Sequence, residues 1–412
     1  MRLLQLIGIS YDFFCKRKWM RLFLSILCGF SLFLSAYAML QILYGYSAIG
    51  GYADAISGDK GQILMITEDS IMDSPEMQER WSNFLRFLKN EVPSSGAFAE
   101  YLGGFPELED NELYRAVNSR QQQIAVLREY PSASKIIIVD CGILSLGKLK
   151  LSFENGQSVP YEGDKKVMLV GTAYEEILSV GMTLTWNGEQ YVVGGFLPKG
   201  GKWPSDQGIT SPDQSCIPMD YCFLAFNQNL KTTTAFGYRS TFVLPDGKKE
   251  ITRQRVWEIA DAFKIGITVK TVDEYIQDSK ALVRDSMREM INICLFTLFI
   301  SSFLNIVSKL MNVMMQKRDY GILYAFGYTA GEIKLIVFFE EILFSIWSII
   351  FCILNCRLFG RILSIPWTMQ LRYIKTHFLW GMSGTLLLME GVALAAIYVF
   401  LGRKKPVDLL KD

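Results

Sequence analysis

Runs of apolar residues alternate with polar stretches and divide the chain into segments of two kinds. Each long apolar run is close to the roughly 20 residues that an α-helix needs to cross a bilayer. The predicted spans cover residues 22–48, 290–308, 335–356 and 378–401. The mostly polar residues 49–289 separate the first span from the second, and the short segments 309–334 and 357–377 join the others. The pattern predicts a membrane protein with four transmembrane α-helices and one large polar domain.

The first predicted span contains a pattern that is typical of signal-peptide cleavage sites. Ala36-Tyr37-Ala38 places small residues two apart after an apolar run. The apolar residues continue past this point to Leu43, and residues 1–21 precede the run. We therefore expect an uncleaved span.

Basic residues beside the spans predict the orientation of the chain, because Lys and Arg concentrate on the cytoplasmic side of a membrane. They precede the first span and follow the fourth, at positions 16, 17, 18, 21, 403, 404 and 405. Both termini, including the tail 402–412, and segment 309–334 are therefore expected at the cytoplasmic face of a cell membrane. Residues 49–289 would then lie outside the cytoplasm. Segment 357–377, expected outside, carries four basic residues and departs from this rule.

Residues 1–21 are too short and too polar to form a further span. Apolar residues recur there at helical spacing, at positions 3, 6, 7, 13 and 14. This pattern favours a helix that lies in the inner face of the bilayer.

The region 49–289 mixes strand-like and helix-like patterns, which predicts an α/β domain. Strands are expected at 62–67, 135–140, 240–247 and 265–271, and helices at 75–91 and 248–264. Residues 148–200 are rich in short strand-like runs, with a turn at "WNGEQ". Residues 271–290 form a charged amphipathic pattern that leads directly into the second span. We expect this stalk, 271–289, to transmit rotation or tilt of the span to the outer domain.

The composition argues against most enzymatic sites. The chain of 412 residues has 42 basic and 41 acidic residues, which does not favour binding to nucleic acid by bulk charge. It has one histidine, His377, and eight scattered cysteines without a CxxC pair, so zinc sites and Cys/His nucleophile sites lack partners. We expect neither an enzyme nor a bound metal or cofactor. Cys216 and Cys222 could pair outside the cell, and the sequence leaves this open.

Ionisable and polar residues inside the predicted spans are candidates for function, because charge is costly in hydrocarbon. Glu390 lies near the middle of the fourth span, and Glu340 and Glu341 lie in the third. The two adjacent glutamates could reach the interface or Asn305 of the second span. A structural role, as a protonated carboxyl that holds helices together, is the alternative for each of them.

The segment "MQKRDYGILYAFGYTAGEIKLIVFFEEIL", 315–343, resembles the loop after the second span in the MacB/FtsX-like permease family of ABC transporters. In that loop a basic-acidic pair precedes an aliphatic element with glycines, and a glutamate opens the third span. The matching positions here are Arg318, Asp319, Gly321, Ile322, Leu323, Ala325, Gly327 and Glu340 or Glu341. Asp319, Tyr320 and Tyr328-Thr329 depart from the commoner residues.

Three further stretches are similar to the same family. They are "KVMLVGTAYEEILSVGMTLTWNGEQYVVGGFLP" in the outer domain, "FFCKRKWMRLFLSIL" before the first span and "KKPVDLLKD" at the end. The resemblance implies two paired permeases and a separate cytoplasmic ATPase, which binds ATP and magnesium and moves the outer domains. It also implies export or extrusion of a peptide, an antibiotic or a lipoprotein-type substrate.

The predicted site for the ATPase is the loop, where small residues leave space between exposed apolar side chains. Its residues are Lys317, Arg318, Asp319, Tyr320, Gly321, Ile322, Leu323, Ala325, Phe326 and Gly327. The alternative function is a membrane-anchored sensing or binding module, or a regulator of cell-wall hydrolases without transport.

Overall fold

The structure, a computed structural model, forms two compact units that are described separately. One unit, the α/β unit, covers Gly45–Val283, and the other, the helical unit, combines Met1–Tyr44 with Arg284–Asp412. The structure describes residues 2–16, 18–68, 75–121, 124, 127, 129–149, 166–206, 208–209, 215–227, 240–245, 249–362, 384, 391–392, 394–395 and 398–399.

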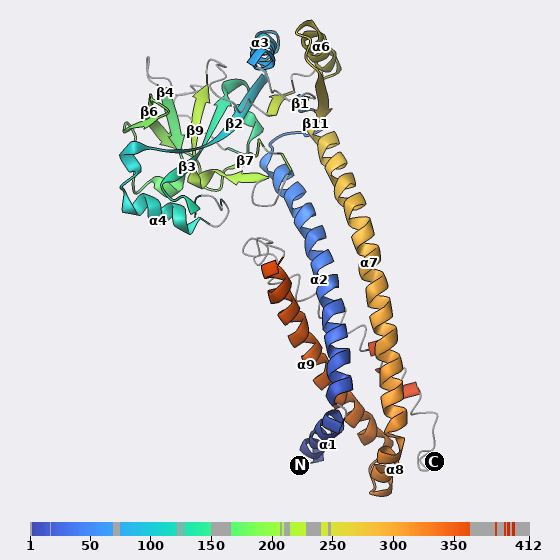
Figure 1. The fold of residues 1–412 in the computed structure, drawn as a ribbon. Helices are drawn as coiled ribbons and strands as arrows, with labels where there is room; N and C mark the ends of the chain where they lie inside the picture. The colour runs from blue at the N-terminus through green and yellow to red at the C-terminus, as the bar shows by residue number, and fades with distance from the viewer. Residues whose placement is uncertain are drawn as a thin grey trace. The chain divides into compact units, whose positions relative to one another are not determined.

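A mixed β-sheet forms the framework of the α/β unit (Figure 1). Within the described part of the chain its strand order is β11-β1-β10-β2-β3-β9-β4-β6-β5. The strands are β1 Leu64–Glu68, β2 Ser95–Gly104, β3 Ala133–Asp140, β4 Lys166–Val170, β5 Thr183–Trp186, β6 Glu189–Phe196, β9 Cys222–Asn227, β10 Ser240–Val243 and β11 Ile267–Thr271. Pairs β3–β9 and β4–β6 are parallel and the other pairs are antiparallel. The short strands β7 Lys202–Pro204 and β8 Cys216–Pro218 pair separately.

Alternation along the strands divides the core between the two faces of the sheet, because successive side chains point to opposite faces. In β1, Leu64 and Ile66 join one cluster and Met65 joins another. In β3, Ile136 lies in a third cluster, while Ile137 lies with Met65. The buried strands therefore carry apolar residues on both faces.

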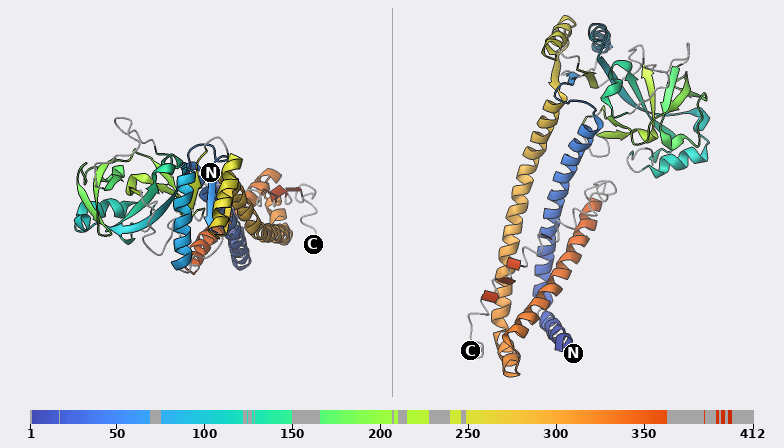
Figure 2. Two further views of the ribbon diagram at one scale, coloured as in Figure 1. Left: turned by 90° about the horizontal axis from the view of Figure 1, so that it is seen from above. Right: turned by 180° about the vertical axis from the view of Figure 1, so that it is seen from behind.

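Two helices cover one face of the sheet at its β11-β1-β10-β2 end. Helix α3, Pro75–Glu91, contributes Trp81 and Phe84, and helix α6, Lys249–Ala262, contributes Val256 and Ile259 to the same buried cluster. Figure 2 shows the two helices side by side. Helix α4, Glu112–Arg120, packs through Tyr114 in the cluster beside β4 and β6.

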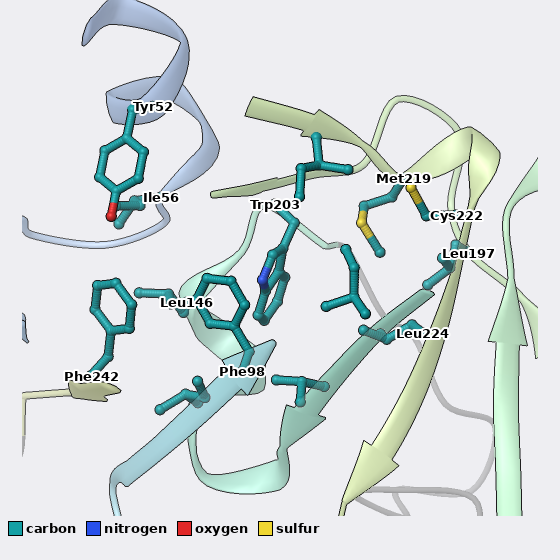
Figure 3. Close-up of a cluster of buried hydrophobic side chains, with 14 of the residues drawn as sticks. Tyr52, Ile56, Phe98, Leu146, Leu197, Trp203, Met219, Cys222, Leu224 and Phe242 are labelled. Carbon is teal, nitrogen blue, oxygen red and sulfur yellow. The ribbon is translucent and has the colours of Figure 1, made fainter. Parts of the chain in front are cut away.

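The opposite face of the sheet packs against large aromatic side chains (Figure 3). Phe98 of β2 stacks on Phe242 at 5.9 Å and meets the edge of Trp203 at 5.5 Å between ring centroids. The 3₁₀ turns Cys141–Leu146 and Met219–Tyr221 contribute buried residues to this cluster, whereas the turns Pro106–Leu108 and Thr172–Tyr174 contribute Leu108 and Tyr174 to the cluster around Ile136. Cys216 and Cys222 are both free thiols, so the possible disulfide between them is absent.

The helical unit contains α1 Arg2–Lys16, α8 Lys317–Ala325 and α9 Ala330–Ile362, with parts of α2 Lys18–Ala55 and α7 Val272–Met315. Within the described residues, two helical stretches are long and apolar enough to cross a membrane, Val272–Leu304 and Ala330–Asn355. They cover most of the second predicted span, 290–308, and all but the last residue of the third, 335–356. The first predicted span lies within α2, and most of the fourth lies outside the described residues.

The local patterns predicted many of these elements. Helix 75–91 has the expected bounds, and the strands expected at 62–67, 135–140, 240–247 and 265–271 overlap β1, β3, β10 and β11. Strand β10 ends at Val243, four residues earlier than expected. The "WNGEQ" turn joins β5 to β6 through Asn187 and Gly188, with φ of 51° and 77°. A two-residue hairpin turn needs such positive φ values. The stalk and the second predicted span form one helix, α7, as expected.

Candidate functional site

The segment predicted as a coupling loop is mostly helical, which corrects the expectation of a loop at 309–334. Helix α7 continues to Met315, α8 covers Lys317–Ala325 and α9 begins at Ala330. A tight turn of four residues separates α8 from α9. The charged residues that suggested a loop instead lie in the first turn of a short helix.

Glycine ends helix α8. Gly327 has a φ of +84° and its N–H donates to the carbonyl of Tyr324 at 3.0 Å, while the N–H of Tyr328 donates to the carbonyl of Leu323 at 3.1 Å. These two bonds define a Schellman motif, in which a residue with positive φ closes the helix. Leu323 and Tyr328 both pack against the same apolar cluster, as this motif favours.

A capping box begins helix α9 immediately after this turn. Glu332 accepts hydrogen bonds from the backbone N–H of Thr329 at 2.8 Å and from its hydroxyl at 3.0 Å. The N–H of Glu332 in turn donates to the hydroxyl oxygen of Thr329 at 3.3 Å. This reciprocal pair satisfies donors that a helix start would leave unpaired. The α8–α9 turn is therefore fixed at both ends by its own residues.

The predicted docking residues fall into two groups. Ile322 and Phe326, one helical turn apart, are 42% and 79% exposed, and Arg318, Ala325 and Gly327 are also exposed. These five residues, together with the partly buried Leu323, are here called the α8 face. Asp319 is half-buried, and the side chain of Lys317 lies outside the described set.

Tyr320 and Gly321 are buried, contrary to the expectation that they face a partner. The ring of Phe13 of α1 meets the edge of the Tyr320 ring, with 5.7 Å between centroids. The Tyr320 hydroxyl donates to Oε1 of Gln316 at 2.8 Å, and burial raises its pKa well above the usual value. Leu6, Ile333, Ile336 and Val337 complete the apolar cluster around Tyr320. Tyr320 therefore holds α8 against α1 and α9.

The N-terminal helix belongs to this packing. The Ser10 hydroxyl donates to the carbonyls of Leu6 and Ile336, at 2.7 and 3.0 Å, and so links α1 to α9. Leu6 and Phe13 are buried, whereas Leu4 and Tyr11 are exposed. The helix is thus amphipathic, as predicted, and its buried face packs against protein.

Glu340 forms an ion pair that the sequence did not suggest. The guanidinium of Arg21 donates to Oε2 of Glu340 at 2.6 Å, and the two side chains are 7% and 4% exposed. The sequence suggested Asn305 or the interface as the partner of the glutamates, and Arg21 served only as a signal of orientation. The pair connects α2 to α9, and the Arg21 guanidinium also lies 5.1 Å from the centroid of the Phe14 ring. The sequence did contain a signal that could have suggested this pair: a basic residue precedes one predicted span and an acidic residue lies inside another.

Glu341 is buried as well, with 8% exposure. The side chain of Asn305 and all of Glu390 lie outside the described residues, so their predicted roles have no structural counterpart.

Helices α2 and α9 approach closely near Gly29. A Cβ atom added to Gly29 would lie 2.7 Å from Cβ of Phe351 and 2.8 Å from the carbonyl oxygen of Ser348. Ser25 and Cys28 of α2 and Cys352 of α9 are buried in the same region. Small residues at a helix interface allow the backbones to approach, which is how helices associate in membranes.

The C-terminal end of α2 is fixed in the α/β unit. Tyr52 and Ile56 lie in the aromatic cluster of the sheet (Figure 3), with 0% and 1% exposure. The N–H of Ser57 donates to the carbonyl of Leu146 at 2.7 Å. Asp54 accepts hydrogen bonds from Lys148 and Lys202, which lower its pKa to about 2.

The N-terminal end of α7 is fixed in the same cluster through Val272 and Ile276. A second capping box begins this helix: Glu274 accepts from the N–H of Thr271 at 2.7 Å, and the N–H of Glu274 donates to the Thr271 hydroxyl at 3.0 Å. Arg253 of α6 donates to Glu274 at 2.9 Å. The hydrogen bond from the N–H of Thr271 and the charge of Arg253 lower the pKa of Glu274.

The two helix ends also contact each other. The rings of Tyr52 and Tyr275 meet edge to face with 5.7 Å between centroids, and a Cβ on Gly45 would lie 2.9 Å from Cγ1 of Val283. The end of α2 and the start of α7 therefore form one packed pair with the sheet. The stalk was predicted from its charge pattern, but its contact with α2 depends on residues more than 200 positions away in the chain.

Comparisons with known proteins add little. No family model matches the chain, and no curated protein matches it. A solved structure that matches it is the X-ray crystal structure of a heavy metal efflux pump, at 11% sequence identity and a TM-score of 0.14. The match covers 86% of this chain and 34% of that chain, so this chain spans about a third of the pump's length. A likeness at this level carries no argument about fold or function.

Proposed function

We propose that the chain is the permease subunit of an ABC transporter, a four-span membrane protein in which a separate ATPase drives a conformational change of the α/β unit. One observation carries the proposal: α2 and α7 each contain residues of both units and end inside the buried core of the α/β unit. Any rotation or tilt of these helices must displace core residues such as Tyr52 and Ile276. Close-packed cores transmit such strain, because they hold few voids that could absorb it.

The α8 face is the proposed docking site of the ATPase. Ile322 and Phe326 present an exposed apolar ridge, and Arg318 adds a charge beside it. The Schellman turn and the capping box hold this ridge in one conformation, so binding costs little ordering entropy. Because Tyr320 packs against Phe13 and the start of α9, a force on α8 reaches those helices.

The proposed role needs no catalytic site in this chain, since the partner ATPase would bind ATP and magnesium. Two copies of the permease would pair in the membrane. The substrate class, a peptide, antibiotic or lipoprotein-type molecule that is exported or extruded, rests on the sequence resemblance alone.

The docking proposal is tested by purifying the full chain from its native membrane with any bound partner and measuring ATP hydrolysis. The expected result is a co-purified ATPase whose activity falls more than tenfold with Phe326→Glu, because loss of a central aromatic anchor costs about 2 kcal/mol or more. Leu282→Glu is the matched control, since Leu282 is also exposed, at 71%, but lies in the α/β unit. An ATPase that stays bound to the Phe326→Glu variant, or none in the wild type, would overturn the proposal. The wild type could instead co-purify with a partner that has no ATPase activity. Loss of such a partner in the Phe326→Glu variant would favour a sensing module or a regulator of cell-wall hydrolases.

A further inference from the structure

An apolar hollow of about 260 Å³ lies in the helical unit, where α1, α2 and α9 meet. It is lined by Phe14, Lys18, Trp19, Leu22 and Trp347. The volume is below the roughly 300–1,000 Å³ of most small-molecule pockets. Four of the five lining side chains are apolar or aromatic, and one is a cation.

One lysine lies at the edge of the hollow. Of the four basic residues at positions 16, 17, 18 and 21, Arg21 is already paired with Glu340, while Lys18 lines the hollow and is exposed. Helix α2 begins at Lys18 and has no acidic residue in its first turn. The partial positive charge at the N-terminus of α2 and the ammonium group of Lys18 therefore both attract an anion at one edge of the hollow.

Two tryptophans, Trp19 and Trp347, lie at the two ends of the hollow. Trp19 and Trp347 are 75% and 41% exposed. Trp347 lies seven residues, or about two helical turns, after Glu340 along α9. The hollow thus runs from a polar edge at Lys18 and Trp19 to an apolar end at Trp347. Tryptophan and lysine are typical of the level where a membrane protein meets lipid headgroups.

We propose that this hollow binds one anionic phospholipid of the inner leaflet, with its phosphate at Lys18 and part of one acyl chain against Leu22 and Trp347. The proposal rests on the membrane setting of the proposed function, but not on the ATPase. A bound lipid would fill the space beside the Arg21–Glu340 pair and exclude water from it. Lipid composition would then influence how α1 and α2 pack on α9.

The test places the full chain in nanodiscs that contain phosphatidylglycerol or phosphatidylcholine with brominated acyl chains, which quench nearby tryptophans. Trp347→Phe identifies the part of the fluorescence that comes from Trp347. Brominated phosphatidylglycerol should quench this part more strongly than phosphatidylcholine at the same fraction. Lys18→Gln should reduce the preference about fivefold, the effect of one lysine near an anionic surface.

Two further variants make the result specific. Lys199→Gln, which removes an exposed lysine of the α/β unit, should leave the preference unchanged. Leu22→Phe should fill the hollow and reduce quenching of Trp347 by both lipids. Equal quenching by the two lipids, or a preference that survives Lys18→Gln, would overturn the lipid site. Absence of quenching at Trp347 in either lipid would mean that protein covers the hollow and would overturn it too. None of these outcomes bears on the ATPase, which is tested by Phe326→Glu.

Discussion

The two units of the chain place their large apolar side chains in opposite ways. In the α/β unit these side chains fill buried clusters on the two faces of the sheet. In the helical unit many of them lie on the surface. Helix α7 shows the change within one element: Val272 and Ile276 are 0% and 4% exposed, whereas Phe299 and Phe303 are 71% and 59% exposed.

This difference indicates two sources of stability. The α/β unit is stabilised by removing apolar surface from water. That effect cannot hold helices together if the surroundings are hydrocarbon, because lipid tails are as apolar as the side chains. The helical unit accordingly contains a close backbone approach at Gly29 and a buried ion pair between Arg21 and Glu340.

The largest expected effect comes from breaking the ion pair of the helical unit. Arg21→Met leaves Glu340 buried without its partner, and we expect a loss of about 3–5 kcal/mol in the free energy of unfolding. Unfolding of the full chain in detergent micelles by increasing SDS measures this loss. Because the two units are stabilised in different ways, we expect the α/β unit to keep its protection from hydrogen exchange in the Arg21→Met variant.

The double variant Arg21→Met with Glu340→Met is the control for this experiment. Replacing both charges with apolar side chains should recover most of the lost stability, because no uncompensated charge remains. Equal instability of the double variant would contradict the assigned role and would indicate that Arg21 acts through its packing on Phe14 instead.

Local sequence signals were sufficient for many single elements of this fold. The amphipathic pattern at 75–91 gave the bounds of α3, and the Asn187-Gly188 pair specified the turn between β5 and β6. Both depend on residues close in sequence. The order of the strands does not, because β1 pairs with β10 and β11, which lie nearly two hundred residues later. Such pairing could not be predicted from periodicity.

The candidate site shows the same limit. The charges of Lys317, Arg318 and Asp319 suggested a loop, although Gly327 and the Thr329-x-x-Glu332 pattern already contained the signals of two helices joined by a turn. The burial of Tyr320 could not be predicted in this way, because it depends on Phe13, about 300 residues earlier in the chain. The partner of Glu340 is equally distant in sequence.

The second prediction uses two positions of helix α7 that have the same exposure. Leu282 and Phe299 are both 71% exposed, but Leu282 lies in the stalk and Phe299 near the middle of the second predicted span. Phe299→Arg should cost about 2.5–3.5 kcal/mol of membrane insertion, the cost of a charge at the centre of a span. Leu282→Arg should cost less than about 0.5 kcal/mol, as for a surface substitution in water.

The measurement is the fraction of chains inserted into microsomal membranes, read from glycosylation of an acceptor site placed on one side of the span. Equal insertion of the Phe299→Arg and Leu282→Arg variants would contradict the proposed span and remove the basis of the comparison.

The third prediction concerns an ion pair of the α/β unit. Lys89 donates to Asp140 at 3.0 Å, and Asp140 also accepts the N–H of Ala97 at 2.9 Å. Burial raises the pKa of Asp140. Lys89→Met removes the compensating charge and should destabilise the unit by about 2 kcal/mol near neutral pH.

The pH dependence of this variant has a definite sign. Because the folded pKa of Asp140 lies above the unfolded value, the folded state binds the proton first, and stability rises as pH falls through the folded pKa. The cost of Lys89→Met should therefore shrink on acidification, whereas that of Lys89→Met with Asp140→Asn should not change. Hydrogen exchange at Ala97 across a pH series, corrected for the intrinsic exchange rate, measures the difference. A destabilisation by Lys89→Met that does not depend on pH would contradict this prediction.

The smallest expected effect separates the two capping boxes. At the start of α7 the N–H of Glu274 donates to the Thr271 hydroxyl, and Arg253 holds the Glu274 carboxylate. At the start of α9 the N–H of Glu332 has two acceptors on Thr329, the hydroxyl at 3.3 Å and the backbone carbonyl at 3.0 Å. Loss of an N-cap hydroxyl costs about 0.5–2 kcal/mol.

Thr271→Ala should therefore cost about 1.5 kcal/mol and Thr329→Ala about 0.5 kcal/mol, because only the second helix start keeps a backbone acceptor for the same N–H. Hydrogen exchange at the amides of Glu274 and Glu332 reports each cost where it arises. Thr271→Ser and Thr329→Ser retain the hydroxyl and should exchange like the wild type. A larger effect at Glu332 would mean that the α8–α9 turn depends on its cap more than the sheet-anchored start of α7 does. The turn would then be the less stable of the two helix starts.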